Sequence, residues 1–205
     1  MKKIGLIIIV VIVLASVYLL FGGNKMNIQS PSVNTTTVSP TNIQPTIDNS
    51  DLKAGESSYS DPQATYTFLY PSDYKLDTTD PKHIRIYKRN ESQRPQSEMT
   101  NGALIVFETI DLSGMSLESW VNMRIKQNTA DGTTKLTEPK KAITQNGYPG
   151  FSYSLQDQGE SQNIVLEKDH NSKNAVFISY SINDPEQKGY QEEVNAILAS
   201  LKLLK

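Results

Sequence analysis

The feature that most constrains this chain is an uninterrupted apolar run close to its N-terminus. The run extends from Ile4 to Phe21, contains no charged residue and directly follows Lys2 and Lys3. A helix rises about 1.5 Å per residue, so a run of this length just spans a bilayer core about 30 Å thick. Because basic residues favour the cytoplasmic side of a membrane helix, we expect a single-pass anchor with a cytoplasmic N-terminus. Everything after Phe21 should then lie outside the cytoplasm.

A cleaved secretory signal is the alternative interpretation of this run. Signal peptides have a shorter apolar region, about 7–15 residues, that ends at a small-x-small cleavage site. Here Ala15 and Val17 lie inside the run, and the Gly22-Gly23 pair at its end makes a poor site. The sequence therefore favours an uncleaved anchor over residues 1–23. In either case the remainder of the chain is exported.

Residues 24–58 are dominated by Ser, Thr, Asn, Gln and Pro and show no apolar period. Such a segment cannot bury enough apolar surface to offset the entropy that it loses on ordering. We expect a disordered linker that holds the following domain roughly 30–35 Å from the membrane on average. The linker either lets the domain reach a partner in the envelope or only keeps it away from the lipid.

Composition excludes several classes of function. The chain contains no Cys, which excludes disulfides, thiolate metal sites and a cysteine nucleophile. Its 20 basic and 22 acidic residues give a net charge of −2, whereas nucleic-acid-binding domains carry a basic surface. We therefore expect no nucleic-acid partner. We also expect the setting to be the envelope of a prokaryotic cell.

Residues 59–205 have the length of one ordinary domain. Alternating apolar and polar residues predict strands near residues 65–70, 83–87, 103–110, 142–145, 151–155, 164–166 and 175–182. Helical spacing predicts one helix that begins after Ser116 and stops at Asp131-Gly132, and another over residues 186–204. Short polar links between the late strands favour an antiparallel meander. The expected fold is α+β, with the strand at 103–110 central in one antiparallel sheet and two main helices on its aromatic face.

Three segments of this domain resemble the PsbP-like superfamily: Phe68–Tyr74, Asn146–Tyr153 and Ile197–Lys202. They are similar, in turn, to the family's opening aromatic-x-Tyr-Pro strand, to the turn and aromatic strand of its middle hairpin, and to its closing helix. Tyr74 stands where many relatives have Trp, and Leu201 stands where many have Phe. The resemblance covers residues 59–205 and implies an α/β/α-type sandwich with a binding or assembly role.

Known branches of this superfamily serve different partners. Photosystem members support a manganese–calcium cluster, and a nuclear-transport branch binds a small GTPase. The expected anchor and linker match neither setting, so no functional residue of the family is transferred to this sequence. Fold alone does not decide function in any case.

An acidic loop is the first candidate site. Asp73, Asp77 and Asp80 lie close together, with Thr78 and Thr79 between the last two. Carboxylates and hydroxyls supply the oxygen ligands that Ca²⁺ prefers, about six to eight of them. The spacing of an EF-hand is absent. The loop is a candidate Ca²⁺ site, with a solvated acidic loop as the alternative, and no other cofactor is expected.

No catalytic constellation is visible in the sequence. His83 and His170 lack the partner spacing that a His-based metal site or a catalytic triad requires. Gly150–Ser154 lacks the last Gly of a nucleophile elbow and lies in an alternating strand. No Gly-Lys pair occurs in the sequence, which excludes a phosphate-binding P-loop.

Aromatic side chains are the remaining candidates for a binding cleft. Tyr87, Tyr148, Tyr153 and Trp120 could line a cleft between sheet and helix. Aromatic residues at strand and helix spacing more often form the core, which is the alternative interpretation of these four.

We therefore predict a membrane-anchored, extracytoplasmic binding or assembly module without enzymatic activity, whose ligand or envelope protein partner the sequence does not identify. One alternative is an envelope hydrolase that uses carboxylates such as Asp77, Asp80 or Glu108. The other is a structural spacer without a ligand.

Overall fold

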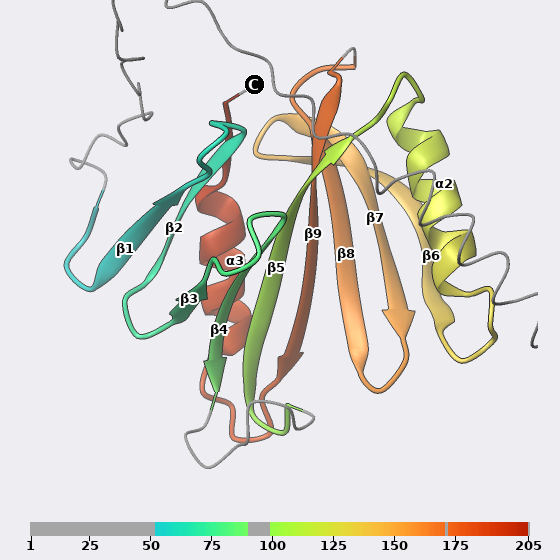
Figure 1. The fold of residues 1–205 in the computed structure, drawn as a ribbon. Helices are drawn as coiled ribbons and strands as arrows, with labels where there is room; N and C mark the ends of the chain where they lie inside the picture. The colour runs from blue at the N-terminus through green and yellow to red at the C-terminus, as the bar shows by residue number, and fades with distance from the viewer. Residues whose placement is uncertain (1–51, 90–98, 171, 205) are drawn as a thin grey trace, which may run out of the picture. The chain divides into compact units, whose positions relative to one another are not determined.

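The computed structural model describes residues 52–89, 99–170 and 172–204 (Figure 1). The predicted anchor and most of the predicted linker lie outside these residues. Among the residues described, no helix combines the length and the apolar composition needed to cross a membrane. The anchor therefore stays a prediction from the sequence.

Ten strands and two helices make up the described part of the chain. The strands are β1 (Glu56–Ser60), β2 (Tyr66–Pro71), β3 (Lys75–Asp77), β4 (His83–Arg89), β5 (Gly102–Asp111), β6 (Lys135–Gln145), β7 (Tyr148–Gln156), β8 (Glu160–Glu167), β9 (Asn174–Asn183) and β10 (Lys202–Leu203). The helices are α2 (Leu117–Asn128) and α3 (Tyr190–Ser200).

These strands form two antiparallel sheets. Seven of them build the main sheet in the order β3-β4-β5-β9-β8-β7-β6, and β1, β2 and β10 build a small sheet. Strands β6 to β9 follow one another in space as they do in sequence, which confirms the predicted meander. The most apolar predicted strand, β5, lies inside the main sheet between β4 and β9.

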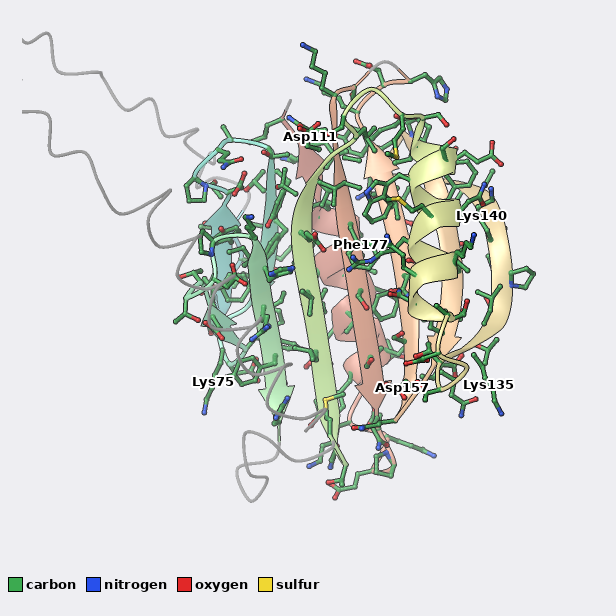
Figure 2. All side chains as sticks on the ribbon, turned by 45° about the vertical axis from the view of Figure 1, so that its right-hand side comes forward. Lys75, Asp111, Lys135, Lys140, Asp157 and Phe177 are labelled. Atoms are coloured by element: carbon green, nitrogen blue, oxygen red, sulfur yellow. The ribbon has the colours of Figure 1, made fainter. Side chains whose placement is uncertain are left out.

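The main sheet lies between the two helices, with α2 in front of it and α3 behind it in Figure 2. Strand β9 explains this arrangement, because its residues are apolar on both faces. Val176 and Ile178 belong to the core beneath α3, whereas Ala175 and Phe177 belong to the core beneath α2. A strand of this kind needs cover on both sides. The prediction that both helices cover one aromatic face is therefore wrong.

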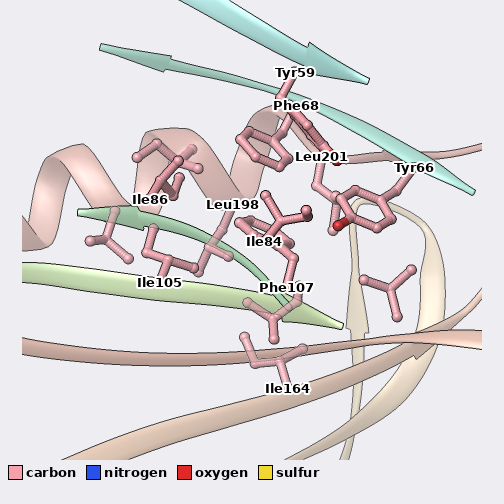
Figure 3. Packing of buried hydrophobic residues seen from close by; sticks show 14 of the residues in the cluster. Tyr59, Tyr66, Phe68, Ile84, Ile86, Ile105, Phe107, Ile164, Leu198 and Leu201 are labelled. Atoms are coloured by element: carbon pink, nitrogen blue, oxygen red, sulfur yellow. The ribbon is translucent and has the colours of Figure 1, made fainter. Parts of the chain in front are cut away.

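The larger core lies between α3, the main sheet and the aromatic side chains of β2 (Figure 3). The ring of Phe68 stacks on Phe107 of β5 with centroids 4.3 Å apart, and Tyr66 stacks on the same ring at 5.6 Å. Aromatic pairs contribute about 0.5–1.5 kcal/mol beyond the area that they bury. Helix α3 adds Val194 and Ile197 from one helical stripe, both almost fully buried.

Helix α2 packs on the other face of the sheet through Leu117, Trp120 and Val121. Ser116 caps it as predicted, because its Oγ accepts a hydrogen bond of 3.2 Å from the backbone N–H of Ser119. The helix ends at Asn128, shortly before the predicted Asp131-Gly132 stop.

The last helix begins later than predicted, at Tyr190 instead of residue 186. Oδ2 of Asp184 accepts hydrogen bonds from the backbone N–H groups of Gly189, at 2.9 Å, and of Tyr190, at 3.2 Å. Gly189 also adopts a left-handed φ of 86°. The carboxylate thus closes a loop before the helix and supplies the acceptor that its first N–H groups need.

The sequence predicts one sheet and a final helix that extends to residue 204. The structure has a second, small sheet in addition to the main one, and its final helix is shorter. Leu201 is extended, so α3 ends at Ser200 and the following residues form β10, which pairs with β2. Strand β1 begins at Glu56, within the range assigned to the linker, and pairs with the other edge of β2. Its buried Tyr59 packs against the aromatic ring of Phe68 with centroids 5.3 Å apart.

Candidate functional site

The acidic loop does not gather its carboxylates around one centre. Oδ2 of Asp73 lies 2.7 Å from Nζ of Lys88. Oδ1 of Asp77 accepts hydrogen bonds from the hydroxyl and the backbone N–H of Thr79, and these bonds hold the pKa of Asp77 below its usual value. In the described ranges, no group of three or more His, Asp or Glu side chains is placed to hold a metal ion. The Ca²⁺ site stays a prediction.

Asp80 instead joins a row of charged side chains on the α2 side of the sheet. Its Oδ2 lies 2.7 Å from Nδ1 of His83, and this hydrogen bond is the main cause that lowers the pKa of Asp80. Glu108 faces His83 across the β4–β5 pairing, with its Oε2 3.7 Å from Nε2 of His83. The same Oε2 lies 3.7 Å from the guanidinium of Arg124 on α2. Two of the carboxylates considered for a hydrolase thus flank one histidine.

The core interpretation is confirmed for two of the four aromatic candidates. Trp120 and Tyr153 are only 7% and 1% exposed, within the core beneath α2. Burial raises the pKa of Tyr153 to about 12, and its hydroxyl has no hydrogen-bond partner among the described residues. Tyr148 accepts a hydrogen bond of 3.1 Å from the backbone N–H of Leu203 and so ties β7 to the C-terminal strand. The guanidinium of Arg89 lies over the ring of Tyr87.

A pocket of about 340 Å³ opens between the first turn of α2 and the β6–β7 hairpin. Small-molecule sites are commonly concavities of about 300–1,000 Å³ with mostly apolar walls and a few polar groups. The apolar wall of this pocket consists of Leu112, Leu117, Ile143, Pro149 and Phe151. Met115 also lines it and is 38% exposed, one of three large apolar side chains that reach the surface of the described residues.

Two local backbone features position these walls. Ser113 and Gly114 have positive φ angles of 49° and 80° in the turn that leads from β5 into α2. Gly150 on β7 lets that strand approach β8 so closely that a Cβ atom would lie 2.1 Å from the carbonyl oxygen of Val165. Both features depend on small residues, since a larger side chain would be strained or would clash.

Lys140 on β6 connects that strand to α2 beside the pocket. Its Nζ donates to Oε1 of Glu118 at 2.6 Å and to Oδ1 of Asn122 at 2.9 Å, both on α2. The same ammonium lies 5.0 Å from the centroid of the Phe151 ring, and Figure 2 shows Lys140 beside the helix. Such contacts are each modest near the surface, about 0.5–1 kcal/mol, but together they hold α2 against the edge strand β6.

Glu167 supplies the polar end of the pocket. It is the last residue of β8, lies on the same strand face as Val165 and is only 7% exposed. Its Oε1 lies 3.2 Å from Nδ1 of His170, whose side chain is 83% exposed. A buried carboxylate is costly unless hydrogen bonds or a cation compensate it. The pocket therefore combines an apolar body with one buried acidic group.

Sequence reasoning missed Glu167, although a signal was present. The run Ile164-Val165-Leu166 is apolar on both faces, and Glu167 follows in the same register as Val165. A charge at an inward strand position is unusual and marks either a buried pair or a binding site. His170 follows three residues later, in the turn where its ring can reach the carboxylate.

Comparison with known proteins reveals similarity at the level of solved structures. No protein-family model matches the chain, and neither does any curated protein. The chain is similar to the Ran-binding protein Mog1p of Saccharomyces cerevisiae, with 12% identity and a TM-score of 0.48 over 73% of this chain and 96% of that one. It is also similar to the cyanobacterial PsbP (CyanoP) of Synechocystis, with 14% identity and a TM-score of 0.48 over 75% and 95% of the two chains.

Both similarities are at low sequence identity and have TM-scores below 0.5. At these identities and TM-scores they assign neither a ligand nor an activity to this chain. Its function has to be argued from its own residues.

Proposed function

We propose that this chain is a membrane-anchored, extracytoplasmic binding module, and that the pocket beside the first turn of α2 is its ligand site. The observation that carries the proposal is the pocket itself, about 340 Å³ in volume, with apolar walls and one buried carboxylate. This combination is typical of sites that hold a small ligand, since apolar area supplies affinity and a few polar groups supply orientation.

The hydroxyl groups around the pocket support binding rather than catalysis. Oγ of Ser116 caps α2, and Oγ of Ser172 donates to the carboxylate of Asp169 at 3.3 Å. A nucleophilic serine needs a general base within hydrogen-bond reach. The ring of His170 contacts Glu167 instead, and neither serine has a histidine partner within the described ranges.

The location outside the cytoplasm is supported by the apolar run Ile4–Phe21 and the two lysines before it. Membranes from cells that express the full chain provide the test. We expect the protein to stay in the membrane fraction after alkaline carbonate extraction and to be digested by protease added outside intact spheroplasts. Release by carbonate would contradict the anchor, and protection from protease would contradict the orientation.

Uptake of a neutral fluorescent apolar probe, N-phenyl-1-naphthylamine, tests the pocket. Ala142 is an exposed lining residue, so Ala142→Trp should fill the mouth of the pocket without disturbing the core. Ala130→Trp, at an exposed position after α2, is the matched control. We expect at least tenfold weaker uptake for Ala142→Trp than for the wild type and the control, at equal detergent concentration. Equal uptake by all three proteins would overturn the pocket as the ligand site.

A carboxylate-dependent hydrolase is the second candidate, favoured by the contacts of His83 with Asp80 and Glu108. A positioned acid–base pair of this kind can activate water. Chromogenic esters and glycosides, incubated with the wild type and with Glu108→Gln, test it. Turnover that Glu108→Gln abolishes would establish the enzyme, whereas rates equal to the blank for both proteins would remove it. A spacer without a ligand is what remains if the probe also fails to bind.

A further inference from the structure

We infer that the pocket selects ligands that join an apolar body to a protonated amine, and that Glu167 receives the amine. The inference rests on the proposed function, because it names the class of ligand for the same pocket. It depends on two observations, which are the burial of Glu167 and the lack of an ion pair between its carboxylate and any Lys or Arg among the described residues.

Glu167 is buried, and His170 is the one side-chain partner that the described residues give to its carboxylate. Its backbone pairs with Ala175 of β9, which fixes the side chain on the α2 face of the sheet. The residue is 7% exposed, and the side-chain contact given to it by the described residues is the ring of His170 at 3.2 Å. Because that ring is 83% exposed, water can solvate it in place of its contact with Glu167, and a ligand can compete with it for the carboxylate. A cationic ligand can therefore replace His170 beside the carboxylate.

Two of the nearby lysines are bound to other groups. Nζ of Lys140 is bound to Glu118 and Asn122, and Nζ of Lys168 donates to the backbone carbonyl of Leu204 at 3.0 Å. Among the described residues, no Lys or Arg forms an ion pair with Glu167. The carboxylate is thus available to a cation that enters with the ligand.

The charges at the pocket favour an amine over an acid or a neutral group. An anionic ligand would meet the buried carboxylate of Glu167, whereas Glu118 at the wall is already paired with Nζ of Lys140. The first turn of α2 acts in the opposite direction, because a helix N-terminus attracts anions. Glu118 stands in that first turn and already complements the helix dipole. A buried charge-assisted hydrogen bond to Glu167 is stronger than the bond that a neutral hydroxyl makes.

The apolar side of the pocket sets the other half of the ligand. Leu112 and Leu117 are 2% and 4% exposed and form a fixed wall, whereas Met115 reaches the surface with a flexible side chain. Phe151 presents a ring on the opposite side. Flexible thioethers and aromatic rings accommodate apolar bodies of different shape. The amine therefore supplies selectivity, and the apolar body supplies contact area.

Competition by three ligands of one shape tests the inference on the full-length chain. At pH 7.5, 3-phenylpropylamine, 3-phenylpropan-1-ol and 3-phenylpropanoate each displace bound N-phenyl-1-naphthylamine. We expect the amine to displace the probe at least tenfold better than the alcohol, and the carboxylate to be weakest. Glu167→Gln should abolish the preference for the amine, so that amine and alcohol displace the probe equally well. Glu160→Gln, exposed at the other end of β8, should leave the whole order unchanged.

A second variant keeps the test informative if Glu167→Gln folds poorly. His170→Ala removes the competing ring, so it should strengthen amine binding more than alcohol binding. Equal affinity for amine and alcohol, or an amine preference that survives in Glu167→Gln, would overturn the inference and leave the proposed pocket standing. Failure of the probe to bind the wild type would overturn both.

Discussion

The side-chain amide of Asn146 donates a hydrogen bond of 2.7 Å to the backbone carbonyl of Leu198. Asn146 lies in the two-residue turn between β6 and β7, and the same amide reaches the carbonyl of Leu201 at 3.1 Å. A helix leaves its last carbonyls without partners inside the helix. The hairpin that lines the pocket on one side of the sheet therefore caps α3 on the other side.

Two substitutions at Asn146 separate its cap from its backbone conformation. Asn146→Gly keeps the positive φ of 53° accessible and removes the cap, so the free energy of unfolding should fall by about 1 kcal/mol. Asn146→Ala also strains the left-handed turn and should cost about 1–2 kcal/mol more. Urea denaturation followed by circular dichroism measures both losses. Equal losses for the two variants would show that the backbone conformation contributes nothing.

Gly150 is the second position where a single methyl group should matter. In Gly150→Ala the added Cβ would lie 2.1 Å from the carbonyl oxygen of Val165, so β7 and β8 must move apart. We expect a loss of about 3 kcal/mol in the free energy of unfolding. Gly159→Ala, in the turn between the same strands with nothing within 4 Å of its Cβ, should change it by about 0.5 kcal/mol or less. Similar thermal stability of the two variants would contradict the close approach.

Asp184 should make stability depend on pH at the acid end. Burial raises its pKa, but hydrogen bonds from the backbone N–H groups of Lys188, Tyr190 and Gly189 outweigh this effect and lower the pKa. A carboxylate with a lowered folded-state pKa stabilises the fold above its unfolded pKa of about 3.9. That contribution is lost as the pH falls through the folded-state pKa.

Asp184→Asn should therefore be less stable than the wild type at pH 7, and the difference should shrink from about pH 4 downwards. Urea midpoints at pH 7, 4 and 2.5 measure this change. Asp157→Asn, in the β7–β8 turn, serves as the control because its carboxylate caps no helix. A constant difference between wild type and Asp184→Asn at all three pH values would exclude the ionised cap.

Tyr153 and Tyr74 are both buried, but replacing them by Phe should have opposite effects on the free energy of unfolding. The hydroxyl of Tyr74 donates to Oε2 of Glu193 at 2.9 Å, so Tyr74→Phe should lower the free energy of unfolding by about 1–2 kcal/mol. The hydroxyl of Tyr153 has no partner in the described residues, so Tyr153→Phe should be neutral or stabilising. A loss above about 1 kcal/mol for Tyr153→Phe would indicate a buried water that its hydroxyl shares with Arg124.

The sequence predicted the elements whose signals are local. Asn146-Gly147 predicts a hairpin because both residues tolerate positive φ, and the structure has φ angles of 53° and 84° there. Ser116 predicts the start of α2 because its side chain can accept a hydrogen bond from a free N–H group in the first turn. Signals of this kind need no knowledge of distant parts of the chain.

The elements that the sequence failed to predict depend on distant partners. Strand β1 has the sequence ESSYS, in which Tyr59 is the single large apolar residue, and β10 contains only two residues. Neither shows a strand pattern of its own, and both become strands because β2 offers two free edges. The late start of α3 depends on a nearer contact, in which the carboxylate of Asp184 accepts a hydrogen bond from the backbone N–H of Gly189.

The charged residues of the sheet face were visible in the sequence, but their grouping was not. Asp80 and Glu108 lie in separate segments of the sequence, and the antiparallel register that places Glu108 opposite His83 brings them to one histidine. The pocket is harder to predict from the sequence than this charged group, because it depends on how the turn after β5 places Leu112 and Met115 above the β6–β7 hairpin. Such packing between separate segments has no signature in a single sequence.

The position of β2 between β1 and β10 brings the two ends of the domain together. With strands about 4.8 Å apart and about 3.3 Å of rise per residue, the start of β1 and the end of β10 lie within roughly 20 Å. A short peptide can bridge that distance, and new ends can be opened in the turn at Asp157, away from the pocket. A circular permutant of this kind keeps every strand neighbour, so the order of the strands along the chain can change while their order in the two sheets stays the same.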